Sequence, residues 1–285
     1  MINKTDGHRS KVLCLAALAV MSTRLASAHP ELIQQIDALT TEIVQQPTSG
    51  VLYLRRGELH RLHRDWPSAQ MDYEKASSTG ADPAGVRLAR GRMLTDAGEL
   101  DRARSELDAL ASEHPDLSAV HLARAQLLQL TTDSLESVDA WTSAIETASE
   151  PRPEWYLSRA ALLFEAGSTR VSAAIQGLEE GIARLGPVIS LQLKAVELEE
   201  RAGLTTAAAA RLEKIAQDAP RRESYLVQLA ELYAHAAEHT SAALHAAQAD
   251  RAIAALPARL QSTSATMALR HRLLSLQTNA MQKSK

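Results

Sequence analysis

The sequence predicts an all-α protein, and three observations support this fold class. Alanine and leucine dominate the chain, which is 45% hydrophobic but only 3% aromatic over 285 residues. That composition favours helices over sheets, because sheets are enriched in β-branched and aromatic residues. Only 12 glycines are present, and small residues return at a step close to 34 residues, a length that accommodates two helices and their turns.

The first 28 residues form a pattern typical of a secretory signal peptide. Lys4, Arg9 and Lys11 precede the apolar run VLCLAALAVM at positions 12–21, and Ala-Ser-Ala follows at 26–28. A spanning helix needs about 20 apolar residues, so this run is too short for a stable anchor. We therefore expect an exported protein, periplasmic or secreted, with no membrane insertion after cleavage. The alternative is a frayed N-terminal helix of a cytosolic protein.

Cysteine usage and charge agree with export. The only cysteine, Cys14, lies inside the apolar run and would leave with it, so the mature chain would have no thiol nucleophile and no thiolate metal ligand. Removing residues 1–28 takes away four basic groups and one acidic group, which changes the net charge from −3 to −6. No basic field remains for nucleic acid or anionic lipid.

Gly57 lies inside a helical run and marks an internal repeat. The same position is occupied, at steps of 34, 34, 35, 36 and 34 residues, by Gly91, Ala125, Ala160, Val196 and Ala230. A second small residue follows in each repeat, at Ala69, Ala103, Ser137, Ala174, Ala208 and Ala242. An interior glycine costs about 1 kcal/mol relative to alanine. A close helix crossing would offset that cost, because only a small side chain fits between two helices that approach closely.

This pattern resembles the tetratricopeptide repeat, a helix–turn–helix of 34 residues with small residues at its eighth and twentieth positions. The resemblance covers about residues 50–256 in six repeats. It implies a right-handed α-solenoid, with repeat-ending prolines at Pro115 and Pro220 and turns at Gly98, Gly167 and Gly203. The sequence departs from the pattern at two places, the irregular turn at 167–171 and the larger Val196.

The remaining elements follow in chain order. After the signal peptide (1–28) we expect an N-terminal capping helix within 29–49, with its helical part at about 30–46. The repeats (50–256) come next, with Pro67 in the first turn of a second helix, where its missing N–H would have no partner. A C-terminal capping helix and tail (257–285) close the array. Terminal repeats of a solenoid have one uncovered face, which such caps protect.

Two histidine pairs raise the question of catalysis or metal binding. His235, Glu238 and His239 match the H-x-x-E-H pattern of inverted zinc peptidases, but the repeat register places them across the end of a helix and its turn. His60 and His63 lie one turn apart, although the position of His60 holds leucine in other repeats, which indicates a packed side chain. We assign no catalytic residue, no metal site and no cofactor.

Two rows of side chains recur in the first helix of each repeat and are candidates for partner binding. An arginine precedes the small residue at Arg56, Arg90, Arg124 and Arg159. In the family that the chain resembles, basic residues of the inner helices can hold an acidic peptide. The alternative, which we favour, is that each arginine pairs with a nearby acid such as Asp72 or Glu106.

The second row is apolar and lies three residues before the small residue, at Leu54, Leu88, Leu122, Leu157 and Leu193, followed by Val227. In the resembling family this position borders the inner groove, so the row is suited to an amphipathic helix or an extended peptide. The alternative is that these leucines fill the seam between adjacent first helices.

The sequence therefore predicts an exported scaffold or adaptor that binds a protein or peptide partner and has no chemistry of its own. Two other hypotheses remain open: a zinc-dependent hydrolase centred on His235 and His239, and a permanent structural subunit of an envelope complex.

Overall fold

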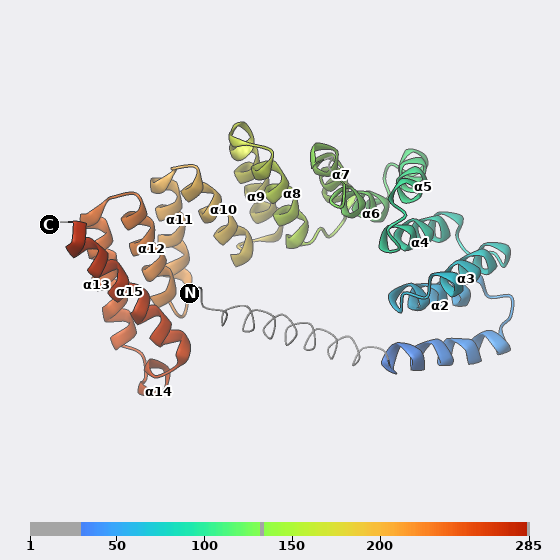
Figure 1. The fold of residues 1–285 in the computed structure, drawn as a ribbon, viewed down its shortest axis with the longest axis horizontal. Helices are drawn as coiled ribbons and strands as arrows, with labels where there is room; N and C mark the ends of the chain where they lie inside the picture. The colour runs from blue at the N-terminus through green and yellow to red at the C-terminus, as the bar shows by residue number, and fades with distance from the viewer. Residues whose placement is uncertain (1–29, 132–133, 284–285) are drawn as a thin grey trace, which may run out of the picture. The chain divides into compact units, whose positions relative to one another are not determined.

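The computed structural model describes residues 30–131 and 134–283, and these residues form helices and turns with no strand. The expected signal peptide, residues 1–28, lies outside the described residues. The chain divides into two compact units, Met1–Thr132 and Asp133–Lys285, so the division falls within the third repeat (Figure 1). The prediction of an all-α fold built from helix–turn–helix repeats is confirmed.

The N-terminal unit consists of six helices in its described part. A helix at 30–45 buries Leu39 and Ile43 against the repeats that follow. The other five are α2 (Gly50–Leu62), α3 (Trp66–Ser78), α4 (Pro83–Asp96), α5 (Leu100–Glu113) and α6 (Ser118–Leu128). The first helices of the three repeats, α2, α4 and α6, are neighbours, while α3 and α5 are the second helices of the first two repeats.

Side-chain caps and prolines set the starts of α3 and α4. The Asp65 carboxylate accepts a hydrogen bond from the backbone N–H of Ser68, and hydrogen bonding with Ser68 holds the pKa of Asp65 below its ordinary value. Pro67 lies in the first turn of α3, as expected, and Pro83 begins α4. An N-terminal proline loses no hydrogen bond there because the first N–H groups of a helix have no intrahelical partner.

The small residues of the repeat lie at close helix crossings, which confirms the interpretation of the 34-residue step. A Cβ atom added to Gly57 of α2 would lie 2.6 Å from Cε1 of Tyr73 on α3. At Gly91 of α4, the same atom would lie 2.6 Å from Cδ2 of Leu107 on α5. Tyr73 and Leu107 are almost completely buried, so each large side chain occupies the space that its glycine leaves open.

The C-terminal unit continues the alternation of first and second helices. Its elements are α7 (Ser134–Thr147), α8 (Pro153–Glu165), the 3₁₀ turn η1 (Ser168–Arg170), α9 (Val171–Leu185), α10 (Ile189–Arg201), α11 (Thr205–Asp218), α12 (Glu223–His235) and α13 (His239–Ala254). The short 3₁₀ turn accounts for the irregular sequence expected at 167–171. Val196 is buried in the core of this unit.

Most turns between the paired helices contain one residue with positive φ. Gly98, Gly167 and Gly203 have φ values of 80°, 119° and 74°, which agrees with the turns expected at these glycines. In two other turns the residue is not glycine: Arg64 has φ 63° and Ala237 has φ 61°. A side chain in this left-handed region is uncommon, and these two turns therefore carry a conformational cost that the glycine turns avoid.

Two helices follow the last repeat. They are α14 (Ala258–Gln261) and α15 (Ser264–Lys283), where the sequence had suggested a single capping helix. The break comes at Thr263, whose hydroxyl accepts a hydrogen bond from the N–H of Thr266 and so caps the start of α15. Helix α15 packs on α12 and α13 and buries Leu269 and Leu273.

Candidate partner-binding groove

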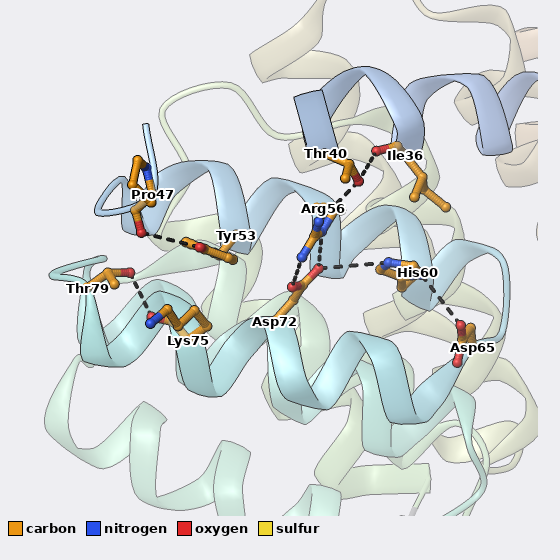
Figure 2. A network of polar contacts seen from close by, with 10 residues as sticks. All are labelled: Ile36, Thr40, Pro47, Tyr53, Arg56, His60, Asp65, Asp72, Lys75 and Thr79. Carbon is orange, nitrogen blue, oxygen red and sulfur yellow. Dashed lines mark hydrogen bonds and ion pairs between the residues drawn. The ribbon is translucent and has the colours of Figure 1, made fainter. Parts of the chain in front are cut away.

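The arginines of the predicted row are paired with acids. Arg56 on α2 makes two hydrogen bonds to the Asp72 carboxylate on α3, of 2.8 Å from Nε and 2.7 Å from NH2. Its third nitrogen donates to the Thr40 hydroxyl at 3.0 Å. Figure 2 shows Arg56 held between the N-terminal helix and α3. The hydrogen bonds with Asp72 raise the pKa of the Arg56 guanidinium above its ordinary value.

His60 completes this polar network (Figure 2). Its Nδ1 lies 3.6 Å from Oδ2 of Asp65 and its Nε2 lies 3.8 Å from Oδ2 of Asp72. The imidazole side chain is 16% exposed, in agreement with the packed position that the repeat register indicates. The metal-binding alternative gains no support, because the described residues contain no cluster of three or more histidine, cysteine or acidic side chains suited to a metal ion.

The other three arginines of the row are also bound to carboxylates. Arg90 contacts Glu106 at 2.6 Å, Arg124 contacts Asp108 at 2.6 Å and Arg159 contacts Glu180 at 2.7 Å. The expected pairing of this row with nearby acids, including Asp72 and Glu106, is therefore confirmed. A partner that used these arginines would have to compete with existing ion pairs, and partner binding by the row stays a prediction.

The leucine row consists of core residues, half-buried residues that pack against the cores, and one residue that lines a groove. Leu88 is 8% exposed and belongs to the core of the N-terminal unit, and Val227 is fully buried. Three others, Leu54, Leu157 and Leu193, are half-buried and pack against the cores. Leu122 is half-buried and lines a groove.

The groove lies along the first helices of the N-terminal unit and has a volume of about 460 Å³. Its lining comes from α2, α4 and α6 and from the turn after α6: Arg61, Arg92, Thr95, Asp96, Leu122, Ala123, Gln126 and Leu130. The apolar part is supplied by α6 and the following turn, where Leu130 is 61% exposed. The polar part comes from α2, α4 and Gln126. A surface of this mixed character suits a peptide more than a small ligand.

One arginine of the groove serves two carboxylates. Arg61 donates to Glu58 at 3.1 Å and also pairs with Asp96, and the Tyr73 hydroxyl donates to Glu58 at 2.6 Å. Burial acts to lower the pKa of Arg61, but the carboxylates of Glu58 and Asp96 raise it overall. Burial, followed by the contact with Glu58, raises the pKa of the Tyr73 hydroxyl far above its ordinary value. These contacts hold Asp96, which lines the groove, and Glu58, which lies beside Arg61.

Arg92 differs from every arginine of the predicted row. It lies on α4 and is half-buried, yet no described acidic oxygen lies within 4.0 Å of its side-chain nitrogens, and its guanidinium donates no hydrogen bond to a described residue. Burial lowers the pKa of its guanidinium, and the nearby carboxylates only partly counteract this effect. The sequence had indicated Arg92 only as a polar neighbour of the leucine row. Sequence alone does not show that the nearby acids, Glu58 and Asp96, already contact Arg61.

The hydrolase hypothesis gains no support from the geometry around His235 and His239. Helix α12 ends at His235, Ala237 takes a left-handed conformation, and α13 begins at His239. The interruption of helical geometry that the repeat register indicated is therefore confirmed. The Nδ1 atom of His235 instead lies 2.8 Å from a carboxylate oxygen of Glu200.

Comparison with known proteins identifies the fold. No family model matches the sequence, and no curated protein matches it. Among solved structures, the C-terminal part of a tetratricopeptide repeat protein from Cytophaga hutchinsonii is similar with a TM-score of 0.59 and 13% identity, covering 84% of this chain and 94% of that one.

Two further structures are more distantly similar. A tetratricopeptide repeat protein from Parabacteroides merdae has a TM-score of 0.46 and 15% identity and covers 90% of this chain and 97% of that one. The pilF protein of Pseudomonas aeruginosa has a TM-score of 0.49 and 15% identity, covering 71% and 91%. Together with the 34-residue register and the helix pairs described above, the Cytophaga match shows that this chain has the tetratricopeptide repeat fold.

Proposed function

We propose that this chain is a protein-binding scaffold that receives a peptide segment of its partner in the groove of the N-terminal unit. The observation that carries the proposal is the groove itself, in which Leu122 and Leu130 supply an apolar surface next to polar side chains of α2 and α4. Apolar anchors surrounded by polar contacts are the usual way in which a groove binds a peptide.

The scaffold has no catalytic role in this proposal. The arginines of the row bind neighbouring acids, and the two histidines of the zinc motif lie on either side of a helix break. What the groove offers a partner is shape, apolar surface and a small number of polar contacts.

The test begins with a random dodecapeptide library displayed on phage and selected against the full-length protein. Leu122→Gln and Leu130→Gln place a polar group in the apolar part of the groove. We expect each change to weaken binding of the selected peptides at least tenfold, which corresponds to about 1.4 kcal/mol. Fluorescence anisotropy with labelled synthetic peptides measures the dissociation constants.

The matched control is Leu244→Gln on α13 of the C-terminal unit, where the leucine is 53% exposed and outside the groove. This control should leave peptide affinity unchanged. Circular dichroism must show that all three variants keep their helical content. Peptides that bind the Leu122 and Leu130 variants as tightly as the unchanged protein would refute the proposed groove.

We also propose that the scaffold is exported. The basis is the sequence of residues 1–28, which is typical of a secretory signal peptide. Separately, none of the described helices is both long and apolar enough to cross a bilayer. When the chain is expressed in a bacterium with its own N-terminus, the purified protein should begin at His29. Edman sequencing measures this directly. A chain that retains residues 1–28 and stays in the cytoplasmic fraction would contradict export.

A further inference from the structure

The N-terminal helix (30–45) carries an exposed apolar face around one acid. Ile33 and Val44 are 46% and 76% exposed, and together with Asp37 they form what we call the N-terminal face. The three residues lie within about 40° of one another around the helix axis, because each residue of an α-helix advances it by about 100°. The Asp37 carboxylate pairs with no described residue. The N-terminal face therefore presents a negative charge between two apolar side chains.

Helix α15 carries the complementary arrangement. Met267 and Leu274 are 60% and 62% exposed, and Arg270 lies between them within about 60° around the axis. We call these three residues the C-terminal face. The Arg270 guanidinium donates one hydrogen bond, of 3.2 Å to the amide oxygen of Gln261, and pairs with no described acid. The C-terminal face therefore presents a positive charge between two apolar side chains.

The charge around each face has a single sign. Residues 30–54 contain three acids, Glu31, Asp37 and Glu42, and no lysine or arginine. Residues 251–285 contain four arginines and two lysines and no acid. Segments of opposite charge attract each other before contact, and this attraction orients two molecules so that unlike faces meet.

We propose that the N-terminal face of one copy of the chain docks on the C-terminal face of a second copy, with Asp37 paired to Arg270. The apolar side chains then pack on either side of this ion pair. The charges select a second copy in this orientation, because two N-terminal faces or two C-terminal faces would repel each other. The inference is independent of the groove and of any peptide partner.

The geometry of such a contact sets the kind of assembly. The contact joins two different faces, so it is heterologous, and each added copy leaves one face of either kind open. One helix meeting one helix buries less area than a standard stable interface of about 1,600 Å². We therefore expect weak, reversible association into short head-to-tail oligomers and not a closed dimer.

Sedimentation velocity of the protein purified from cells that express the full chain tests this association, over a hundredfold range of concentration up to about 0.5 mM. The weight-average sedimentation coefficient should rise with concentration and pass the value for a dimer. Asp37→Arg and Arg270→Asp should each weaken association by about tenfold or more, since each places like charges opposite each other. The double variant with both changes restores opposite charges and should recover most of the association.

Two matched controls have the same changes of charge outside the faces. Glu42→Arg lies on the same helix as Asp37→Arg, but Glu42 is exposed about 140° around the axis from Asp37. Arg102→Asp is the control for Arg270→Asp, because Arg102 is 70% exposed on α5. Both controls should associate as the unchanged protein does. Leu274→Gln should weaken association through the apolar part of the face, and circular dichroism verifies the helical content of every variant.

Three results would overturn the inference. One is a sedimentation coefficient that stays at the monomer value throughout, as it would if the two faces met within one chain. Another is association that survives both single charge reversals, or that the two controls weaken equally. The third is a monomeric protein that floats with phosphatidylglycerol vesicles unless Arg270 is reversed, because an anionic bilayer and not a second copy would then cover the C-terminal face.

Discussion

Replacing Gly91 by leucine is expected to destabilise the N-terminal unit by about 3 kcal/mol, near the upper end of the range for overpacking in a core. The first added carbon would already lie 2.6 Å from Cδ2 and 2.8 Å from Cγ of Leu107. Leu107 is fully buried, so it cannot move into solvent to make room. Helices α4 and α5 would have to separate, and the contacts between them would weaken. Urea unfolding followed by circular dichroism measures the change in stability.

Gln126→Ala is the control for this prediction. Gln126 follows Ala125, the small residue of the third repeat, and its side chain is exposed. Its replacement should therefore change stability by less than about 0.5 kcal/mol. If Gly91→Leu and Gln126→Ala gave the same unfolding midpoint, the small residue would not mark a tight crossing of α4 and α5.

Arg56→Met is expected to be the second strongly destabilising change, at about 3 kcal/mol. Methionine keeps much of the apolar stem but leaves the Asp72 carboxylate, whose side chain is 6% exposed, without its guanidinium. Removing one partner of a buried ion pair typically costs about 3 to 5 kcal/mol of stability, because the remaining charge stays buried. The lower end applies here, since the His60 ring lies 3.8 Å from Asp72 and offers partial compensation.

The matched control is the adjacent Arg55→Met, because Arg55 is exposed on the same helix and should change stability little. Combining Arg56→Met with Asp72→Leu removes both charges and should recover most of the loss. Urea unfolding of the three proteins tests this. If Arg56→Met alone unfolded at the same urea concentration as Arg55→Met, the bidentate pair would contribute nothing to the fold.

The helix pairs were predictable from sequence because the repeat imposes a local constraint. Two helices cross closely only where a side chain is small, so Gly57 and Gly91 mark in the sequence the two close helix crossings found in the structure. Turns were predictable wherever glycine supplies positive φ, as at Gly98. The turn at Arg64 has no such signal, because its residue at positive φ is an arginine, a type with no preference for the left-handed region.

The groove was harder to predict because residues at one repeat position have different surroundings. Leu88 and Leu122 share the position three residues before the small residue, yet Leu88 is part of the core and Leu122 borders the groove. Their burial depends on neighbouring helices and not on their own repeat. The lack of a described acidic partner for the Arg92 guanidinium depends further on which acids Arg61 has already bound, a choice among rotamers that a repeat pattern does not contain.

The ion pairs of the first helices fall into two classes according to which repeats they join. Arg56 and Arg90 pair with acids of their own repeat, on the second helix that follows. Arg124 pairs backwards with Asp108, and Arg61 pairs forwards with Asp96, so these two contacts join successive repeats. In a nearest-neighbour description of a repeat protein, the first class adds to the intrinsic stability of single repeats and the second to the coupling between them. The cooperativity of unfolding within the N-terminal unit therefore depends on Arg61 and Arg124 more than on Arg56.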